Sequence, residues 1–456
     1  MNKTYDHIIV GTGQATGTLL GKLIPTGDSI AVIEGHKIGG SCVNYGCTPT
    51  KALVASAKAI HQARLGDEFG FKADVMIDFP RIKARMNEIR AESNHGLTEW
   101  IESTKNVRLI RGWAKFEGNK TIRIGEENIT GKHIYINTGT RAVNPPVEGL
   151  ENVPWLDNAR LLDLDVLPNH LIIVGGGYIG VEFAQVFRRF GSEVSIIQHG
   201  SVLMPREDED VSLAIQEFLL AEGIKIHCDA AAKSVSQLNG VIELVAEQNG
   251  VEKSLRGSHL LIATGRKPNS DKLNLESTDI QVNKRGYIQV DDHCQTAVEG
   301  VFALGDVNGH GAFTHTSVND AEIVLDYLFG GQRKISSRVP IYALFTDPPL
   351  GRVGMTEKEA IDKDYKILTA IKPMAEISRA KEMSETTGFV KVIVDAKTDQ
   401  LLGALILGVG GDEVIGMFAT MIHGKIPCNR FREIVLIHPT VSELMPWVFD
   451  MLDPVD

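Results

Sequence analysis

Two stretches of the chain repeat one pattern: an apolar strand, a glycine-rich turn and an amphipathic helix. In the first, residues 8–10 predict a buried strand, residues 11–17 a turn, and leucines over 19–23 a helix. A second apolar strand over 29–33 ends at Glu34. Such a turn lets a pyrophosphate approach the backbone at a helix N-terminus, and the acid can hold a ribose hydroxyl. The first stretch therefore predicts a dinucleotide-binding unit.

The pattern recurs in the middle of the chain with the same spacing. Residues 171–174 predict an apolar strand, and the span from Gly175 to Gly180 gives the complete glycine pattern before a helix. A strand over 194–197 then ends at Gln198, 23 residues after Gly175, just as Glu34 lies 23 residues after Gly11. Because only the first copy has the acid, the two copies predict two dinucleotide sites with different ligands.

The remaining patterns divide the chain into four segments. Thr-Gly turns at 138–139 and 264–265 close the two units, and from about residue 338 strands and helices continue without a nucleotide loop. We predict an α/β fold with two Rossmann-like domains, whose parallel sheets are covered by helices, and a C-terminal α+β domain. The expected segments are 1–149, 150–268, 269–338 and 339–456, and the third returns to the first domain.

Composition narrows the classes of function. A net charge of −11 argues against broad nucleic-acid binding and against attraction to anionic membranes. The sequence has no apolar run long enough to cross a bilayer, and its first residues predict a buried strand rather than a signal sequence. We therefore expect a cytoplasmic protein, a setting in which a cysteine pair is more often catalytic or metal-binding than structural. The isolated cysteines at 228, 294 and 428 are expected to be structural.

The candidate chemistry is concentrated in the span from Cys42 to Cys47. Thr48 fits a helix N-cap and Pro49 the first helical position, so we predict a helix just beyond Cys47, with its apolar face over residues 53–60. A thiolate at a helix N-terminus is favoured by the helix dipole, and Lys51 lies one turn away. These residues indicate a redox pair, and two unrelated buried cysteines are the alternative.

Together these motifs resemble the class I pyridine nucleotide–disulfide oxidoreductases, which include glutathione reductase, dihydrolipoamide dehydrogenase and mercuric reductase. The likeness extends over essentially the whole chain. Its motifs are, in order, Gly11, Gly13 and Glu34; Cys42, Cys47 and Lys51; Thr138-Gly139; Gly175, Gly177, Gly180 and Glu182; Thr264-Gly265-Arg266; Gly305-Asp306; and His438-Pro439-Thr440 with Glu443. The spans 309–315 and 347–354 look like a mercuric-reductase-like bacterial branch.

The resemblance implies an enzyme whose electrons reach the cysteine pair. Hydride would pass from NADPH or NADH to FAD, and the reduced flavin would open a Cys42–Cys47 disulfide. Cys47 would then contact the flavin, and Cys42 would attack a small disulfide or oxidant. Lys51 and Glu182 would pair near the flavin.

The resemblance also implies a homodimer, with residues 339–456 as its dimerisation domain. His438, oriented by Glu443 five residues later, would be the general acid–base for the other subunit's cysteines. Active sites would therefore be shared between subunits.

The same resemblance assigns one set of residues to FAD and another to NAD(P). No resident metal site is predicted. Tyr178 would be a movable cover on the nicotinamide side of the flavin. The FAD residues would be Gly11, Gly13, Glu34, Gly40, Ser41, Lys51, Ala114, Thr138, Gly139, Arg266, Gly305 and Asp306. The NAD(P) residues would be Gly175, Gly177, Tyr178, Ile179, Gly180, Glu182, Gln198, His199 and Gly265.

Departures from the family pattern leave the coenzyme and the electron acceptor open. Gln198 lacks the charge that would repel a 2′-phosphate, and His199 and Arg206 would help to bind one, so the sequence leans towards NADPH. The alternatives to reduction of a small disulfide or oxidant are reduction of a soft metal ion, Hg(II) or Cu(II), at the same dithiol, and a dihydrolipoamide dehydrogenase activity. A non-enzymatic, flavin-bound redox sensor is the alternative from another class. True mercuric reductases end in an adjacent cysteine pair, which residues 451–456 lack, so mercury turnover would lack the usual delivery thiols.

Overall fold

The computed structural model describes residues 3–455; residues 1, 2 and 456 of the predicted outer segments lie outside them. Its first sheet has the order β3-β2-β1-β6-β5-β4, with β16 also paired to β6. Strands β3, β2, β1, β6 and β16 run parallel, and β5 and β4 continue the sheet antiparallel. The strands are β1 (Lys3–Val10), β2 (Ile30–Glu34), β3 (Val107–Arg111), β4 (Ala114–Gly118), β5 (Thr121–Ile124), β6 (Glu127–Ile136) and β16 (Val301–Ala303).

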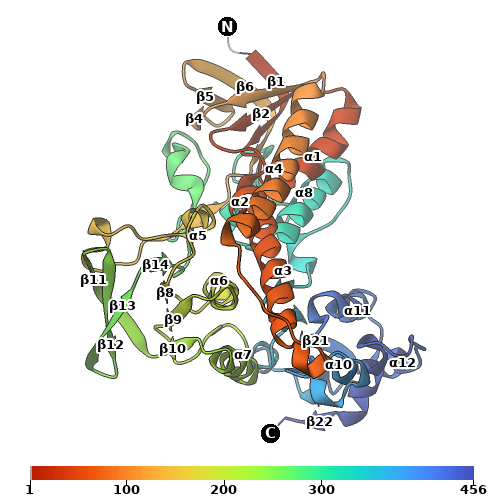
Figure 1. Ribbon diagram of the computed structural model, residues 1–456. Coiled ribbons are helices and arrows are strands. Elements are labelled where there is room, and N and C mark those ends of the chain that lie inside the picture. The colour runs from red at the N-terminus through yellow and green to blue at the C-terminus, as the bar shows by residue number, and fades with distance from the viewer. Residues whose placement is uncertain (1–2, 456) are drawn as a thin grey trace.

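Helices cover this first unit and connect it to the rest of the molecule. Helices α1 (Ala15–Leu23) and α8 (Thr314–Leu328) pack together on the sheet, and Leu19, Leu20 and Val324 join one buried cluster with the strands. Helix α2 (Gly40–Tyr45) leads into α3 (Cys47–Arg64), which packs beside α4 (Phe79–Ser103). Figure 1 shows α3 running from the first unit towards the C-terminal unit.

The second unit repeats the parallel arrangement on a smaller scale. Its sheet has the order β10-β9-β8-β14, and an antiparallel sheet β11-β12-β13 adjoins it (Figure 1). The strands are β8 (His170–Val174), β9 (Glu193–Ile197), β10 (Lys225–His227), β11 (Ala230–Leu238), β12 (Val241–Gln248), β13 (Val251–Gly257) and β14 (His259–Ile262). The helices are α5 (Asn158–Leu162), α6 (Tyr178–Phe190) and α7 (Glu209–Ala221).

The C-terminal unit is built on an antiparallel sheet of order β17-β18-β21-β20-β19-β22. A separate pair, β7 (Thr140–Ala142) and β15 (Arg266–Pro268), joins the two turns that close the first and second units. The C-terminal strands are β17 (Ile341–Leu344), β18 (Leu350–Gly354), β19 (Ile367–Pro373), β20 (Phe389–Asp395), β21 (Gln400–Leu407) and β22 (Asp453–Pro454). The helices are α9 (Glu357–Asp362), α10 (Ser378–Glu382), α11 (Gly411–His423) and α12 (Cys428–Phe431).

The predicted α/β class, with two Rossmann-like sheets and a C-terminal α+β unit, is confirmed. Both strand–turn–helix–strand repeats form where the apolar pattern places them. The first strand is longer than predicted and extends back to Lys3. Strand β4 was not predicted from the sequence. No helix within residues 3–455 is long and apolar enough to cross a membrane.

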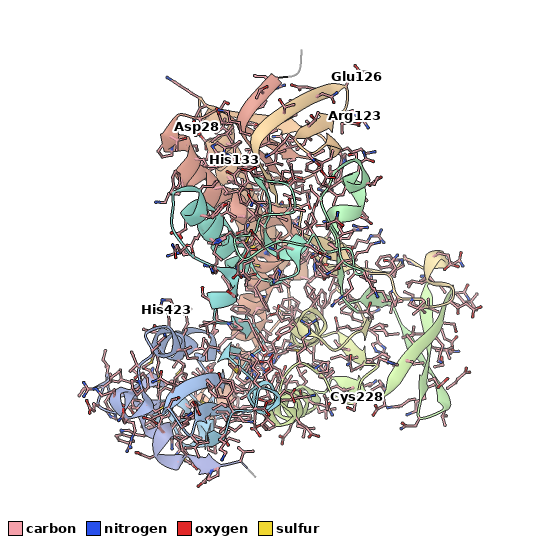
Figure 2. All side chains as sticks on the ribbon, turned by 180° about the vertical axis from the view of Figure 1, so that it is seen from behind. Asp28, Arg123, Glu126, His133, Cys228 and His423 are labelled. Atoms are coloured by element: carbon pink, nitrogen blue, oxygen red, sulfur yellow. The ribbon has the colours of Figure 1, made fainter. Side chains whose placement is uncertain are left out.

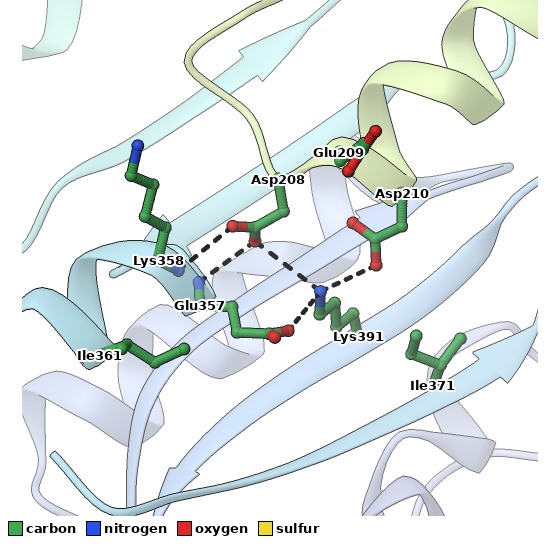
Figure 3. A pocket seen from close by; sticks show the side chains of 8 residues that line it. All are labelled: Asp208, Glu209, Asp210, Glu357, Lys358, Ile361, Ile371 and Lys391. Atoms are coloured by element: carbon green, nitrogen blue, oxygen red, sulfur yellow. Dashed lines mark hydrogen bonds and ion pairs between the residues drawn. The ribbon is translucent and has the colours of Figure 1, made fainter. Parts of the chain in front are cut away.

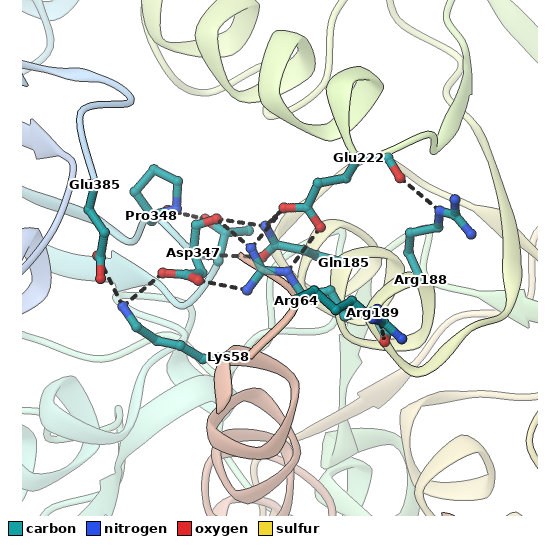
Figure 4. A network of polar contacts seen from close by, with 10 residues as sticks. Lys58, Arg64, Gln185, Arg188, Arg189, Glu222, Asp347, Pro348 and Glu385 are labelled. Carbon is teal, nitrogen blue, oxygen red and sulfur yellow. Dashed lines mark hydrogen bonds and ion pairs between the residues drawn. The ribbon is translucent and has the colours of Figure 1, made fainter. Parts of the chain in front are cut away.

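A buried polar network fixes the units against one another (Figure 4). The Asp347 carboxylate accepts hydrogen bonds from Lys58 of α3 at 2.9 Å and from Arg189 of α6 at 2.6 Å. Arg189 also pairs with Glu222, at the end of α7, at 2.8 Å. The Arg189 side chain is only 4% exposed, so removing one partner would leave a charge buried without compensation. This network connects the first, second and C-terminal units.

Gly180 gives a stability prediction for the second unit. A Cβ at Gly180 would lie 2.0 Å from the Gly175 carbonyl oxygen, whereas a Cβ at Gly177 would meet nothing within 4 Å. We expect Gly180→Ala to lower the free energy of unfolding by about 1–3 kcal/mol, because helix and loop must separate. Urea unfolding followed by circular dichroism measures this change. Gly177→Ala is the matched control, and equal effects of the two substitutions would contradict the steric argument.

Candidate active site

The first glycine loop lies between β1 and α1, where the backbone passes close to the end of β6. Gly11 has φ +91°, and a Cβ there would lie 2.5 Å from the Asn137 carbonyl oxygen, so the position requires glycine. The Glu34 carboxylate accepts hydrogen bonds from the Thr12 backbone N–H at 2.9 Å and from its hydroxyl at 2.6 Å. Its other oxygen accepts from the His36 N–H at 2.8 Å. The acid predicted to hold a ribose therefore also shapes the loop.

The second loop, between β8 and α6, has the same construction. Gly175 has φ +117°, and a Cβ there would lie 2.4 Å from the Ala263 carbonyl oxygen. The Gln198 side-chain oxygen accepts a hydrogen bond from the Gly176 N–H at 2.9 Å. The Gln198 amide thus stabilises this loop in the way that the Glu34 carboxylate stabilises the first loop. The outer side of Gly177 is open. The loop thus offers backbone N–H groups at the start of α6 to an anionic ligand.

The two cysteines lie at the junction of two helices. Cys42 is inside α2, and Cys47 is the first residue of α3. The sequence predicts α3 to start at Pro49, with Thr48 as its N-cap, and this is wrong by two residues. The reason is Gly46, whose φ of −135° and ψ of −114° end one helix and allow the next to begin immediately. Both cysteines are free thiols in this structure.

The environment makes the two thiols chemically different. The hydrogen-bonding interaction with Cys42 lowers the pKa of Cys47 to about 6; Thr314 and the charge of Lys51 add to this effect against desolvation. The same interaction with Cys47, together with burial, raises the pKa of Cys42 far above its usual range. The Cys47 sulfur lies 3.3 Å from the Thr314 hydroxyl oxygen. At neutral pH, Cys47 is therefore a thiolate and Cys42 a protonated thiol.

The structure brings Lys51 and Glu182 together beside the dithiol. The Lys51 ammonium lies 2.8 Å from one oxygen of the buried Glu182 carboxylate, and the other oxygen accepts from the Phe345 N–H at 2.9 Å. The same ammonium is 4.4 Å from the centroid of the Phe345 ring. The pair thus joins α3 to α6 and to the segment after β17.

A second polar group lies where β7 and β15 meet. The Asp306 carboxylate accepts from the Thr140 hydroxyl at 2.7 Å, and that hydroxyl accepts from Arg266 Nε at 2.8 Å. The adjacent Thr138 hydroxyl is buried and has no hydrogen-bond partner among residues 3–455. A buried hydroxyl without a partner is costly, which points to a ligand that would bond to it.

The other predicted cofactor residues surround these loops. A Cβ at Gly13 would lie 2.8 Å from the Asn137 side-chain oxygen. Gly40 and Ser41 begin α2, Ala114 begins β4, and Gly139 and Gly265 immediately precede β7 and β15. Gly305 lies two residues after the end of β16, Ile179 is in the first turn of α6, and His199 is exposed after β9.

His438 and Glu443 form a pair of their own on the C-terminal unit. His438 Nδ1 lies 2.8 Å from the Glu443 carboxylate, and the histidine side chain is 77% exposed. Val435 and Ile437 in the same loop are 95% and 78% exposed. Among residues 3–455, Glu443 is the hydrogen-bond partner of the His438 ring, and the ring makes no hydrogen bond to Cys42 or Cys47. Apolar side chains of this size on one loop favour burial against another molecule.

Sequence reasoning missed several residues around the dithiol. Phe313 and Thr314 belong to the span 309–315, which was noted only for its likeness, and Tyr342 and Glu207 were not assigned to any site. Glu207 opens the acidic run over 207–210, a pattern that is typical of a helix N-terminus. Helix α7 does begin at Glu209, but Glu207 is bonded elsewhere, to Tyr178, Tyr342 and Arg352.

The other three cysteines do not join the dithiol. Cys294 and Cys428 are buried. Cys228, labelled in Figure 2, lies in the second unit, where its thiol donates to the Gln216 side-chain oxygen at 3.5 Å. Their surroundings agree with the structural role expected of them.

Comparison with known proteins identifies the family. A family model described as pyridine nucleotide-disulphide oxidoreductase matches residues 5–321, and a model of the dimerisation domain of that family matches residues 341–449. The chain belongs to this family. Family members are oxidoreductases that use FAD with NADH or NADPH, and this chain is one of them. The dimerisation domain supports a homodimer.

Individual relatives match over nearly the whole chain. The probable pyridine nucleotide-disulfide oxidoreductase RclA of Escherichia coli is 37% identical and covers 99% of this chain and 100% of its own length. A solved structure titled HOCl-induced flavoprotein disulfide reductase RclA, from the same organism, has a TM-score of 0.89, with 36% identity over 98% of this chain and 99% of that one. The mercuric reductase of Bacillus cereus is 31% identical over 97% of this chain, which spans 70% of that protein.

The residues present fit the family's flavin. A dinucleotide needs a close backbone approach and polar groups that can bond to it. This structure offers the backbone at Gly11, where only glycine fits, the Thr138 hydroxyl, which has no partner among residues 3–455, and the Glu34 carboxylate at the end of β2. They lie at the carboxyl ends of the parallel strands, where ligands of such sheets bind.

Proposed function

We propose that this enzyme uses Cys42 and Cys47 to reduce a small disulfide or oxidant with electrons from NADH or NADPH. The observation that carries the proposal is the placement of the two thiols: Cys47 begins α3 with its sulfur 3.3 Å from the Thr314 hydroxyl, and Cys42 lies in the helix just before it. When bound, FAD would take a hydride from the coenzyme and supply two electrons to the cysteine pair.

The chemistry at the cysteines follows from their protonation. Cys42 would lose its proton to a base and attack one sulfur of the substrate disulfide, forming a mixed disulfide and releasing a thiolate that takes up that proton. Cys47 would then attack the Cys42 sulfur, closing the Cys42–Cys47 disulfide and releasing the second half of the substrate as a thiolate, which takes a proton from solvent. Because Cys47 is already a thiolate, this second attack needs no further base.

His438 is the base that we assign to Cys42. An ionised carboxylate only accepts hydrogen bonds, so Glu443 holds the proton of His438 on Nδ1 and leaves Nε2 free to accept one. The exposure of His438 and of its apolar loop supports placing it in the partner subunit's site, with the two active sites shared across the dimer. Glu443 is then a positioning residue.

The two nucleotide units are assigned to the two cofactors by their loops. Gly11, Gly13, Glu34, Thr138 and Asp306 would hold FAD, together with the other flavin residues predicted from the sequence. Gly175, Gly177 and Gln198 would hold the coenzyme, and Lys51 paired with Glu182 would lie near the flavin. The neutral Gln198 and the exposed side chains of His199 and Arg206 support NADPH over NADH.

The domain division predicted from the sequence remains part of this proposal. The strands β8, β9, β10 and β14 all fall within 150–268, and β16, within 269–338, pairs with β6 of the first segment. These pairings support a first domain that is interrupted by the second. A cytoplasmic location also remains a proposal, supported by the composition alone.

The electron acceptor is proposed by class, and a metal ion is the second candidate. The solved structure of RclA is titled a flavoprotein disulfide reductase, which supports a small disulfide or oxidant as the electron acceptor here. A second solved structure of RclA is titled as a Cu(II) complex, with 36% identity and a TM-score of 0.90, and the mercuric reductase is 31% identical. Two neighbouring thiols suit the soft ion Hg(II), and they also suit Cu(I), the product of Cu(II) reduction. The dihydrolipoyl dehydrogenase of Geobacillus stearothermophilus is 27% identical, so lipoamide, the disulfide form of dihydrolipoamide, belongs among the acceptors to be tested.

An anaerobic titration tests the proposal. The purified flavoprotein would be titrated with NADPH and separately with NADH while the visible spectrum is recorded. A long-wavelength thiolate-to-flavin charge-transfer band after two electrons supports a working dithiol, and the coenzyme that produces it faster is the preferred one. An acceptor panel of small disulfides, hypohalous oxidants, Cu(II) and Hg(II) then follows. Loss of flavin colour without the band would exclude the dithiol mechanism, and slow turnover with every acceptor would favour the sensor.

The pKa of Cys47 predicts how that band depends on pH. The thiolate is present above about pH 6 and is lost as the pH falls through that value, so the band should fade with a midpoint near pH 6. Thr314→Val removes a hydrogen bond that lowers this pKa, and the midpoint should therefore rise. Absorbance titration of the two-electron-reduced protein measures both midpoints. A band unchanged down to pH 4 would contradict this assignment.

A further inference from the structure

Two tyrosines from different units share one carboxylate oxygen next to the dithiol. The Tyr178 hydroxyl donates to Glu207 Oε1 at 3.2 Å, and the Tyr342 hydroxyl donates to the same oxygen at 2.8 Å. The two rings meet edge to face with centroids 5.7 Å apart, and both also contact Phe313. Phe313 precedes Thr314, whose hydroxyl contacts the Cys47 sulfur. The Glu207 carboxylate is therefore connected to the redox pair through the two tyrosine rings, Phe313 and Thr314.

Glu207 itself is held from the other side. Its Oε2 accepts from Arg352 Nε at 2.6 Å, and the two side chains are 0% and 1% exposed. The following residues are also tied to the C-terminal unit, because Lys391 lies 2.8 Å from Asp210 and 3.9 Å from Asp208 (Figure 3). Glu207 is thus fixed to the dimerisation domain whether or not Tyr178 bonds to it.

We propose that Glu207 acts as a catch: its carboxylate holds Tyr178 in the position that covers the nicotinamide site. Tyr342 is the positioning residue that allows Tyr178 to move away. The inference rests on the proposed role of Tyr178 as a movable cover over the nicotinamide site. When Tyr178 swings away, Oε1 keeps the hydrogen bond from Tyr342. The buried carboxylate oxygen is then never without a donor, so the catch opens at low cost.

The two tyrosine hydroxyls should therefore have opposite effects on coenzyme binding. In Tyr342→Phe, Tyr178 becomes the sole donor to Oε1, and opening the cover leaves a buried charged oxygen unsatisfied, which is strongly unfavourable. In Tyr178→Phe, the cover loses its bond to the catch, while Oε1 keeps its donor in both positions. A general loss of packing would weaken binding in both variants and would not give opposite signs.

Isothermal titration of the FAD-loaded enzyme with NADP⁺ and NAD⁺ tests the catch without turnover. We expect Tyr342→Phe to raise the Kd by about tenfold, and Tyr178→Phe to lower it by about threefold, from the cost of unsatisfied and single hydrogen bonds. The double variant should bind more tightly than Tyr342→Phe alone, since Oε1 then lacks donors in both states. Tyr135→Phe, which removes a buried tyrosine hydroxyl bonded to His7 in the first unit, is the matched control.

The outcomes separate this inference from the proposed function. Shifts of the same sign in Tyr178→Phe and Tyr342→Phe, or shifts no larger than that of Tyr135→Phe, would overturn the catch. If the wild-type enzyme still shows the charge-transfer band, the proposed dithiol function stands in that case. A wild-type enzyme that binds neither nucleotide and gives no band would overturn both. Because Tyr178→Phe retains the Tyr342 bond to Glu207, it keeps the test decisive if Tyr342→Phe does not fold.

Discussion

Replacing Cys42 with serine is expected to lower disulfide reductase turnover by a factor on the order of 10³ or more, because the attacking thiol is lost. Serine is close in size, and Cys47 keeps its place at the start of α3. Transfer of electrons from the coenzyme to a dye that accepts them directly from the flavin should continue, since it does not require the dithiol. Steady-state assays with a small disulfide and with such a dye measure the two activities on one preparation.

Controls separate loss of the nucleophile from general damage to the fold. Cys228→Ser removes a partly buried cysteine of the second unit and should leave both activities unchanged. Cys47→Ser should abolish the charge-transfer band as well as disulfide turnover, because the thiolate itself is gone. If Cys42→Ser retained disulfide turnover, the cysteine pair would not be the reducing centre, and electrons would leave from the flavin directly. If only Cu(II) or Hg(II) turnover fell in this variant, the metal would be the preferred acceptor.

The nucleotide loops could be predicted because their chemistry is local in sequence. Each loop needs a strand, glycines and a polar residue at the end of the next strand, and Gly11 to Glu34 and Gly175 to Gln198 supply these within one βαβ segment. The polar side chain bonds back to a backbone N–H of its own loop in both copies. The spacing therefore reflects a direct contact, which explains why it repeats.

The surroundings of the dithiol could not be predicted, because its partners are distant in sequence. The Cys47–Thr314 contact joins residues 267 apart, and the Glu207–Arg352 contact joins residues 145 apart. An acidic run before a helix is a common helix start, so nothing local distinguishes the buried Glu207 from the other acids of the run. The error at the start of α3 is of another kind. It comes from the unusual backbone of Gly46, which capping patterns do not describe.

The second large effect is expected at His438, and it depends on which subunit carries the substitution. His438→Gln should lower disulfide turnover by about 10²–10⁴-fold, since the general base that takes the Cys42 proton is lost. A heterodimer of one Cys42→Ser subunit and one His438→Gln subunit should nevertheless regain about half of the wild-type turnover. In that dimer, one site combines both substitutions, and the other combines an intact Cys42 with an intact His438. Co-expression with two affinity tags, followed by purification on both, yields this heterodimer.

The reciprocal heterodimer makes the test decisive. It pairs a wild-type subunit with a subunit that carries both substitutions, so each shared site lacks one essential group and turnover should be near zero. If instead each chain used its own histidine, the first heterodimer would be inactive and the second would have half of the wild-type turnover. Because the two arrangements predict opposite results from the same four side chains, subunit stability and flavin content cannot mimic either one. An active reciprocal heterodimer would therefore show that the exposed His438 loop turns back to its own thiols, and the shared active site would have to be abandoned.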